Sequence, residues 1–291
     1  MSNLERSYTR ILSHLQLLTS KSNFLNQRRQ PQLSDIELIA LVIVSEYLGI
    51  DSERELFRRL SHSMLERIER SVYHRRKKRL SFQIESLRRE MAEQMIADDP
   101  YFIIDFMPLE VCKMSRSNRS VICKEDMESS PNHGFCASQQ MRFYGYKLHS
   151  VCSSQGIFKS FDLTPASVHD IHYLNDVKNQ MKDCVLIGDK GYLNHSVQFD
   201  LFESRNIKLE VPMRKNQLNF SKMHWTLRKA RKRIETLFSQ LCDQFMIRRN
   251  YAKTFKGFAT RILATLTALT TIQWINHLQR RHINNLKIRL N

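Results

Sequence analysis

Hydrophobic residues recur at helical spacing along residues 1 to about 95, and this pattern predicts a helical amino-terminal region. Its clearest start signal is the segment SDIE, in which Ser34 can cap a helix and Glu37 can reciprocate before an apolar run. That helix should end near Leu48, and GIDSERELFRRL should begin another helix after a short turn. Residues 34–61 are therefore a helix-turn-helix candidate, although a plain hairpin of two amphipathic helices explains the pattern equally well.

The pattern changes at Pro100, after which apolar, β-rich runs alternate with helical segments. The first three strands follow one another as a meander, and the later strands alternate with helices. This order predicts an α/β fold, a mixed sheet with helices on its faces, in which ligands collect at the carboxyl ends of the strands. We expect strands at 101–112, 141–153, 157–165, 184–189 and 207–212, and helices at 166–181, 194–205, 223–245 and 255–278.

The charge of the chain is strongly positive and unevenly distributed. The 291 residues carry a formal net charge of +17, and the last 87 residues hold 19 Lys and Arg against 3 Asp and Glu. That balance is too basic for an ordinary cytosolic enzyme and indicates a polyanionic partner. The carboxyl-terminal third should form the face that meets it.

Composition also limits the compartment. Residues 1–10 are polar and do not resemble a signal peptide, and the most apolar stretch, residues 36–50, contains two glutamates and is shorter than the roughly 20 residues of a membrane span. We therefore expect a cytoplasmic protein with reduced thiols. One metal-site alternative uses Cys112, Cys123, His133 and Cys136, but their spacings fit no zinc pattern well.

Two acids stand at similar positions on strands that should be neighbours. Asp105 lies in the first predicted strand, and Asp189 ends the fourth. A crossover helix after the meander usually places the next parallel strand beside the first one, so the two carboxylates should lie side by side. Their repulsion would be relieved by a hard divalent cation, which prefers oxygen ligands and can assist phosphodiester chemistry. The ordinary alternatives are a backbone hydrogen bond for Asp105 and a helix cap for Asp189.

A third acid lies on the long basic helix. Glu235 is the only acid between Glu210 and Asp243, and its neighbours include Arg228, Arg231 and Lys232. It sits at the edge of the apolar face of that helix, from which it could reach the strand ends. A carboxylate surrounded by cations suits a scissile phosphate. The alternative is a helical ion pair with Arg231 or Lys232, which stabilises a helix by only a few tenths of a kcal/mol.

With these residues, the chain resembles a DDE transposase of a bacterial insertion sequence, and the insertion sequence 982 family is the nearest branch. The resemblance rests on IIDFMPLEVC, YGYKLHSVCSSQGIFKSFDLTPASVHD, IGDKGY and RKARKRIETLFSQL, within residues 100–250. It implies a ribonuclease-H-like catalytic domain that cuts DNA at the ends of the element and joins the 3′ ends to target DNA. It also implies that Asp105, Asp189 and Glu235 bind Mg²⁺, with Mn²⁺ as a substitute.

A related transposase group carries a Tyr-x2-Arg-x3-Glu-x6-Lys signature around its catalytic glutamate. Arg231 and Glu235 match this signature, whereas Arg228 and Cys242 stand where it has Tyr and Lys. Roles tied to that Tyr and Lys are therefore not transferred. Only 46 positions separate Asp189 from Glu235, which leaves no room for a large inserted domain.

The resemblance and the charge together give the expected organisation. Residues 1–97 would form a helical domain for DNA binding or dimerisation, 98–250 the catalytic domain, and 251–291 a last helix with a basic tail. The expected partner is double-stranded DNA, both terminal inverted repeats and target, with a homodimer or larger assembly on it. Candidate DNA contacts are Lys190, Arg214, Lys215, Arg228, Arg231 and Lys232.

Two alternative functions share these features. An inactive DNA-binding protein would keep the basic surface without chemistry, and a structure-selective nuclease would share the three acids. His149 and His169 are expected to be structural, because isolated histidines on a strand or at a helix start usually satisfy local hydrogen bonds.

Overall fold

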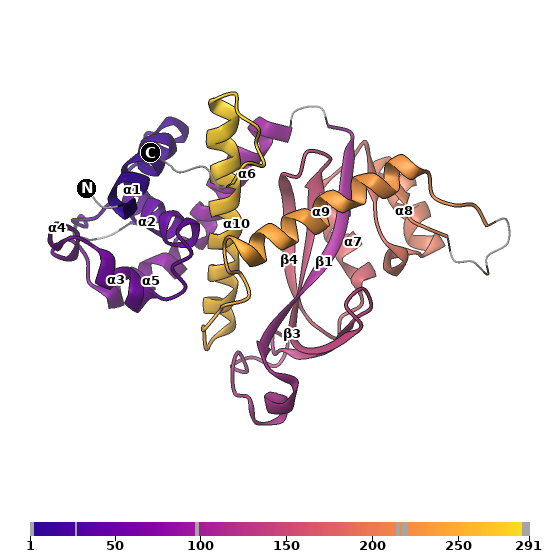
Figure 1. Ribbon diagram of the computed structural model, residues 1–291, viewed down its shortest axis with the longest axis horizontal. Coiled ribbons are helices and arrows are strands. Elements are labelled where there is room, and N and C mark those ends of the chain that lie inside the picture. The colour runs from indigo at the N-terminus through magenta and orange to yellow at the C-terminus, as the bar shows by residue number, and fades with distance from the viewer. Residues whose placement is uncertain (1–2, 27, 97–98, 214–215, 217–219, 287–291) are drawn as a thin grey trace. The chain divides into compact units, whose positions relative to one another are not determined.

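The computed structural model describes residues 3–26, 28–96, 99–213, 216 and 220–286. Its chain divides into two compact units, one formed by Met1–Met95 together with Gln240–Asn291 and the other by Ile96–Ser239. Figure 1 labels the helices and strands of both units. Each unit is described on its own below.

The first unit is helical, as its hydrophobic pattern predicts. Helix α2 is almost completely buried, and α10 packs against it along a similarly apolar surface. This packing explains why both helices are apolar around most of their circumference. The helices of the unit are α1 (Asn3–Leu18), α2 (Asp35–Tyr47), α3 (Glu53–Arg59), α4 (His62–Leu65), α5 (Arg70–Arg79), α6 (Ser81–Ile96) and α10 (Phe255–Leu278).

The start of α2 is fixed by local chemistry. The Ser34 hydroxyl accepts the backbone N–H of Glu37, and the Glu37 carboxylate accepts the backbone N–H of Ser34, so the predicted capping box is present. The next residue, Asp35, is fully buried and pairs with Arg76 at 2.6 Å. Its other oxygen accepts the backbone N–H groups of Phe24 and Leu25. The cap and the buried ion pair together anchor the loop before α2.

The second unit contains one six-stranded sheet with the order β2-β3-β1-β5-β6, in which β4 also pairs with β3. The strands are β1 (Tyr101–Cys112), β2 (Asn132–Cys136), β3 (Met141–Ser153), β4 (Phe158–Pro165), β5 (Cys184–Ile187) and β6 (Ile207–Glu210). Strand β3 is antiparallel to β1 and β4, whereas β5 is parallel to both β1 and β6. Four strands joined by antiparallel pairing, β1 to β4, followed by two parallel ones, with β1 between the two groups, form the predicted ribonuclease-H-like mixed sheet.

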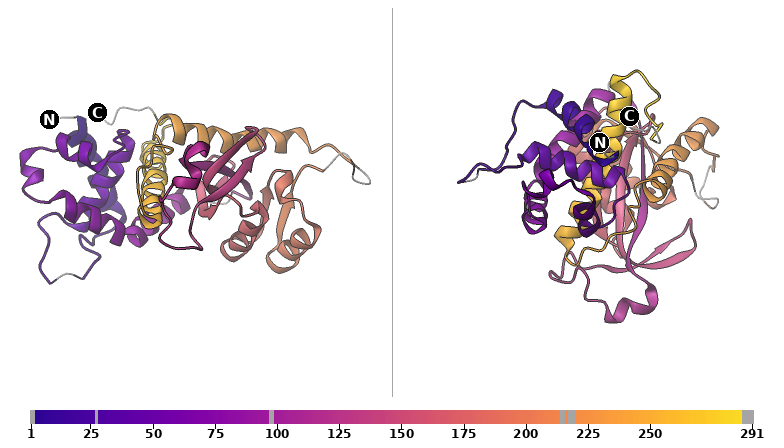
Figure 2. Two further views of the ribbon diagram at one scale, coloured as in Figure 1. Left: turned by 90° about the horizontal axis from the view of Figure 1, so that it is seen from below. Right: turned by 60° about the vertical axis from the view of Figure 1, so that its left-hand side comes forward.

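Helices cover both faces of this sheet. Figures 1 and 2 show α9 (Trp225–Asp243) along one face and α7 (Tyr173–Gln180) with α8 (His195–Arg205) on the other. The stacked rings of Phe158 and Phe238 join α9 to the hairpin of β3 and β4. Asn194 caps α8 through its side chain, and Asn206 ends that helix in a left-handed conformation.

The structure corrects several predicted boundaries. Helix α7 begins at Tyr173 rather than 166, because Asp170–His172 forms a separate 3-10 turn before it. Strand β5 ends at Ile187, so Asp189 lies beyond the strand. Strand β2 was not predicted, because its NHGFC sequence contains one glycine and few β-forming residues.

The carboxyl-terminal segment, expected as a last helix with a basic tail at 251–291, contains the helix α10, which belongs to the first compact unit. It packs against α2 and α5, and α2 supplies much of the apolar surface that a 24-residue apolar helix needs. No helix in the described part of the chain is long and apolar enough to cross a membrane.

Candidate active site

Asp105 lies on the central strand of the sheet, which fixes its position firmly. Its neighbours Ile103 and Ile104 are fully buried, and Asp105 pairs with Ser150 on β3. One carboxylate oxygen, Oδ1, accepts the backbone N–H of Phe106 at 2.8 Å. The side chain is 17% exposed, so it can meet a ligand from one side only.

Asp189 reaches the same region from the adjacent strand. Ile103 of β1 pairs with Ile187 of β5 in the parallel ladder, and each aspartate follows its isoleucine by two residues. Asp189 caps a short 3-10 turn, Lys190–Tyr192, in which its Oδ1 accepts the backbone N–H of Gly191 at 2.8 Å. The alternative reading of Asp189 as a cap is therefore correct, and the cap holds the carboxylate beside β1.

Glu235 and Arg231 come from α9, on one side of the sheet. The guanidinium of Arg231 lies 3.7 Å from Asp105 Oδ2, whereas Glu235 is exposed. No group of three or more His, Cys, Asp or Glu side chains in the described ranges is gathered closely enough to hold a metal ion. The same holds for the alternative set Cys112, Cys123, His133 and Cys136. Asp105 and Asp189 thus follow a paired position of adjacent strands, whereas the three acids, all among the described residues, do not form a group that could hold a metal ion.

Electrostatics nevertheless link all three acids. Burial, followed by the negative charges of Asp189 and Glu235, raises the pKa of Asp105 to about 7. The backbone N–H of Phe106 and the guanidinium of Arg231 act in the opposite direction. A carboxyl group whose ionised form is this unfavourable gains strongly from a nearby cation.

The donor set fits a hard divalent cation in chemistry. All three candidate ligands are carboxylates, and Asp105 carries the raised pKa that a cation between like charges would reverse. Asp105 and Asp189 are held by strand and cap, so they would form the fixed part of such a site. The side chain of Glu235 is exposed, so it can turn toward the other two carboxylates.

The comparisons identify the family. The model of the Transposase DDE domain matches residues 96–271, more than half of the chain. The chain belongs to this family. Membership implies a DNA transposase enzyme, in a family that generally uses divalent metals. The matched region includes all three acids of the predicted triad.

Two further comparisons add little to the assignment. A solved structure, the crystal structure of a pre-cleavage Mos1 transpososome, is 11% identical to this chain, with coverage of 92% of this chain and 84% of that chain. Its TM-score is 0.23, which is too low to support an inference. No curated protein matches the sequence.

The remaining predicted DNA contacts differ in how exposed they are, and two of them lie outside the described residues. Lys190, Arg228 and Lys232 are exposed, so their charges are available to a polyanion. Arg231 is partly buried beside Asp105. Arg214 and Lys215 lie outside the described residues.

The two histidines have local partners, as expected. The ring of His149 is fully buried, its Nε2 lies 2.9 Å from the Thr164 hydroxyl, and it stacks on Tyr173. Burial, and to a smaller extent the charge of Lys147, lowers the pKa of His149 to about 3. His169 caps the 3-10 turn by accepting the backbone N–H of Ile171.

Sequence reasoning missed a pair of charged residues next to Asp189. Lys147, in the middle of β3, is 7% exposed and donates to Asp170 Oδ1 at 2.7 Å and to the Val168 carbonyl at 2.8 Å. The signal was present in YGYKLHSVC, where a lysine stands in a strand that is apolar on both sides. Such a lysine must find an acid within the fold, because a buried unpaired ammonium is costly.

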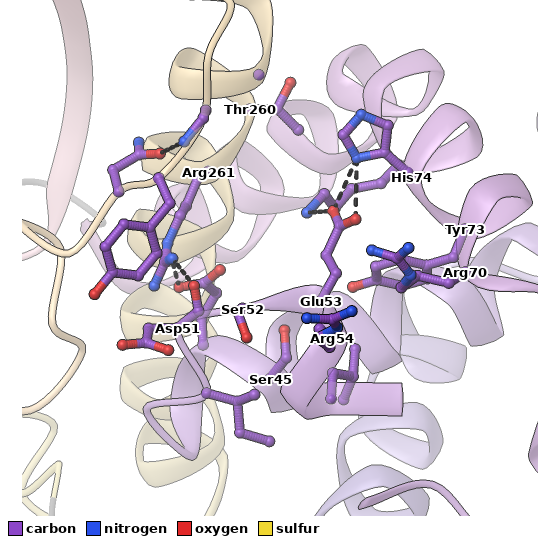
Figure 3. Close-up of a pocket in the computed structure, with 18 of the residues that line it drawn as sticks. Ser45, Asp51, Ser52, Glu53, Arg54, Arg70, Tyr73, His74, Thr260 and Arg261 are labelled. Carbon is purple, nitrogen blue, oxygen red and sulfur yellow. Dashed lines mark hydrogen bonds and ion pairs between the residues drawn. The ribbon is translucent and has the colours of Figure 1, made fainter. Parts of the chain in front are cut away.

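A pocket of about 280 Å³ in the helical unit is a second candidate site. Figure 3 shows that its lining comes from α2, α3, α5 and the start of α10. Its buried acids already have partners. Glu53 accepts from Lys77 at 2.6 Å and lies 3.0 Å from His74, and Glu46 lies 3.6 Å from Arg261.

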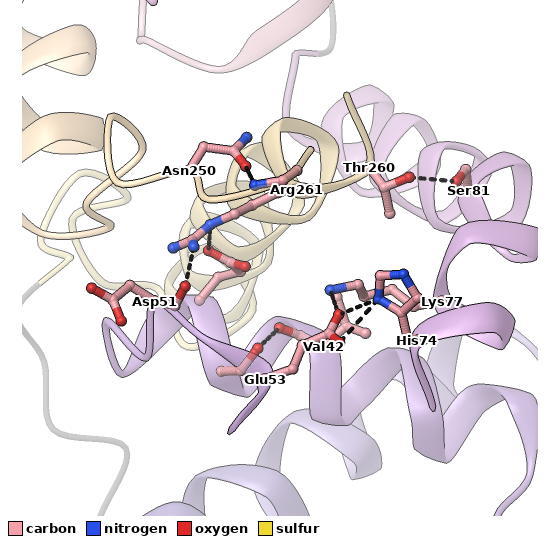
Figure 4. A network of polar contacts seen from close by, with 12 residues as sticks. Val42, Asp51, Glu53, His74, Lys77, Ser81, Asn250, Thr260 and Arg261 are labelled. Carbon is pink, nitrogen blue, oxygen red and sulfur yellow. Dashed lines mark hydrogen bonds and ion pairs between the residues drawn. The ribbon is translucent and has the colours of Figure 1, made fainter. Parts of the chain in front are cut away.

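The polar network around this pocket holds its walls together. In Figure 4, Arg261 reaches the backbone carbonyl of Asp51, and the hydroxyls of Thr260 and Ser81 lie 3.5 Å apart. The Ser45 hydroxyl donates to the Val42 carbonyl at 2.7 Å. These contacts join α10 to α2 and α6, so the network has a structural role in the helical unit.

Proposed function

We propose that this protein is an active transposase that cuts phosphodiester bonds at the ends of an insertion sequence and joins the freed 3′ ends to target DNA. The observation that supports this best is that Asp105 in β1 and Asp189 just beyond β5 each follow the Ile103–Ile187 pair of adjacent parallel strands by two residues, within a matched Transposase DDE domain. We further propose that it belongs to the insertion sequence 982 branch of these enzymes.

The proposed site binds metal through Asp105, Asp189 and Glu235. When bound, Mg²⁺ or Mn²⁺ would activate a water or a 3′-hydroxyl and stabilise the leaving oxygen. The protein's own contribution is to hold two carboxylates rigidly, Asp105 by the β1 ladder and Asp189 by its cap on Gly191. Glu235, on the surface of α9, completes the set by turning inward when a cation offsets the repulsion.

DNA binding would rest on the basic side of α9 and the turn after Asp189. Arg228 and Lys232 are exposed on the same helix as Glu235, and Lys190 is exposed next to Asp189. Cations at these positions can hold the DNA backbone on either side of the scissile phosphate. Arg214 and Lys215 are proposed contacts from sequence alone. Since two DNA ends must be joined to one target, we propose at least a homodimer on DNA.

The test is cleavage and strand transfer of a labelled duplex that carries the terminal repeat of the protein's own element. Wild type should nick and join this duplex with Mg²⁺ or Mn²⁺, and Asp189→Asn should lose activity by at least about 10³-fold while still binding the duplex. Glu203→Gln, an exposed acid on α8, is the matched control and should retain activity.

The outcomes separate the alternatives. DNA binding without metal-dependent cleavage in wild type would indicate an inactive DNA-binding protein. Cleavage of branched DNA without any joining of the terminal repeat would indicate a structure-selective nuclease. Full activity in Asp189→Asn would refute the proposed site.

A further inference from the structure

A buried polar layer lies beneath the two aspartates, on the face of the sheet covered by α7. Phe106 pairs with His149 across β1 and β3, and Lys147 lies next along that face, with its ammonium 4.7 Å from the Phe106 ring centre. Asp105 instead lies beside Arg231 of α9, on the opposite face. The layer therefore supports the site from behind and is not part of the surface that would meet DNA.

Asp170 connects this layer to Asp189. Its Oδ1 accepts from Lys147, whereas its Oδ2 points to the turn that follows Asp189. A Cβ atom added to Gly191 would lie 2.9 Å from Asp189 Oδ1 and 3.2 Å from Asp170 Oδ2. The two carboxylates thus approach the same small space, and only a glycine fits between them.

Tyr192 adds an independent observation. Its side chain is fully buried, and its hydroxyl has no hydrogen-bond partner among the described residues. Its ring lies beside the strand that carries Asp105, because a Cβ atom added to Gly188 would lie 3.1 Å from Tyr192 Cδ2 and 3.2 Å from Ile104 Cγ2. Burial, followed by the charges of Asp105, Asp170 and Asp189, raises the pKa of this phenol and keeps it protonated. A buried O–H donor without a partner costs free energy, and a carboxylate that moves on ligand binding would satisfy it.

We infer that Asp170, held by Lys147, and the hydroxyl of Tyr192 are positioning residues that orient Asp189 and Asp105 for divalent-cation binding. Lys147 fixes Asp170, and Asp170 limits where the Asp189 turn can lie. When Asp105 or Asp189 turns away from the other aspartate, Tyr192 donates its O–H to the one that has turned. This inference rests on the proposed function, because it concerns the same two aspartates.

The test variants are Asp170→Asn, which removes the negative charge, and Tyr192→Phe, which removes the hydroxyl. Each new side chain keeps nearly the shape of the original. We expect each variant to raise the Mn²⁺ concentration for half-maximal binding by about 10- to 100-fold, the range seen when groups behind metal ligands are changed. Binding is measured by electron paramagnetic resonance of free Mn²⁺ and by the Mn²⁺-dependent shift in melting temperature, so the readout does not depend on catalysis. Metal-dependent cleavage should lose a similar factor at low Mn²⁺ and recover at high Mn²⁺.

A matched ion pair provides the control. Lys178 and Asp200 also form a Lys–Asp pair at 2.7 Å, but on the surface between α7 and α8. Asp200→Asn should leave both the Mn²⁺ midpoint and cleavage unchanged. If Asp170→Asn unfolds the protein, Tyr192→Phe, which removes one oxygen atom, still tests the inference.

The results distinguish this inference from the proposed function. Unchanged Mn²⁺ midpoints in both variants, with wild type active and Asp189→Asn inactive, would overturn the positioning role alone. If wild type neither binds Mn²⁺ nor cuts the duplex, the proposed function and the positioning role fall together. A higher Mn²⁺ midpoint in both variants, with cleavage restored at high Mn²⁺, supports the positioning role.

Discussion

Asp105 and Asp189 each stand two residues beyond a paired position, Ile103 with Ile187, on adjacent parallel strands of the sheet. Because the two strands run parallel, Asp105 within β1 lies level with Asp189, which comes just after the end of β5. Burial of Asp105 and, after it, the charge of Asp189 raise the pKa of Asp105, so the stability of the folded protein depends on the ionisation of that group.

The first prediction is that Asp105→Asn stabilises the metal-free protein at neutral pH. The folded-state pKa of Asp105 is about 7, above the ordinary value of 3.8, so the folded protein binds this proton more tightly than the unfolded chain. The protonated carboxyl of Asp105 therefore stabilises the folded protein at low pH, and this contribution is lost as pH rises through about 7. In EDTA, urea unfolding should show Asp105→Asn gaining on the order of 1–3 kcal/mol over wild type between pH 5 and pH 8.

The control for this prediction is the exposed-site variant Glu203→Gln, unfolded in urea at the same pH values in EDTA. The assigned pKa would be contradicted if the difference in unfolding free energy between Asp105→Asn and wild type did not change with pH. It would also be contradicted if wild type became relatively more stable as pH rises.

The second prediction concerns His149 and has the opposite sign. Its folded-state pKa of about 3 lies below the ordinary 6.5, so the unfolded chain takes up this proton first as pH falls. Stability is therefore lost as pH falls below about 6.5. His149→Gln, whose amide can still reach Thr164, should lose less stability than wild type between pH 7 and pH 5, by on the order of 2 kcal/mol.

The measurement is again urea unfolding, taken as the difference between variant and wild type at each pH. Subtraction is needed because Asp105 titrates in the opposite sense over part of the same range. A difference that does not change with pH would show that His149 binds its proton equally in the folded and unfolded states, and would contradict its lowered pKa.

The third prediction tests the buried ion pair of the helical unit. Asp35→Asn leaves Arg76 buried without its charged partner, since Arg76 is 6% exposed and lies 2.6 Å from Asp35. Breaking a buried pair from one side typically costs about 3–5 kcal/mol, which should appear as a lower urea midpoint. Glu55→Gln, in a surface pair with Arg59 at 2.8 Å, is the control and should change the midpoint much less. Equal effects of the two variants would contradict the role of burial.

Most of the secondary structure could be predicted because its signals are local. The Ser34 cap and the apolar run after it define the start of α2, and the predicted range of the last helix, 255–278, is the range observed for α10. The neighbouring placement of β1 and β5 followed from the crossover rule.

The features that were missed depend on residues distant in sequence. Asp170 interrupts a helical pattern because its partner is Lys147, 23 positions earlier on β3, and no periodicity within 166–181 shows this. The position of Arg231, 3.7 Å from Asp105, depends on how α9 packs on the sheet, which a helical pattern does not show. The association of α10 with α2 depends on two apolar surfaces that sequence shows only separately.

The last prediction concerns Gly145, where β1 and β3 approach most closely. A Cβ atom at this position would overlap the carbonyl oxygen of Leu109, and it would also meet the backbone of Glu110 and Val111 at 3.0 Å. Because these are backbone atoms within a ladder, they cannot move aside as a flexible side chain would. Gly145→Ala should therefore separate the strands next to the irregularity between Glu110 and Cys112, and shift the strand that carries Asp105.

The matched control is Gly49→Ala in the helical unit, where φ is +64° but the nearest atom to a Cβ is a methionine methyl at 3.6 Å. That variant should cost only about 1–2 kcal/mol, from backbone strain. Thermal melting followed by circular dichroism should show a much larger loss for Gly145→Ala, and a loss no greater than that of Gly49→Ala would show that the two strands have room to part.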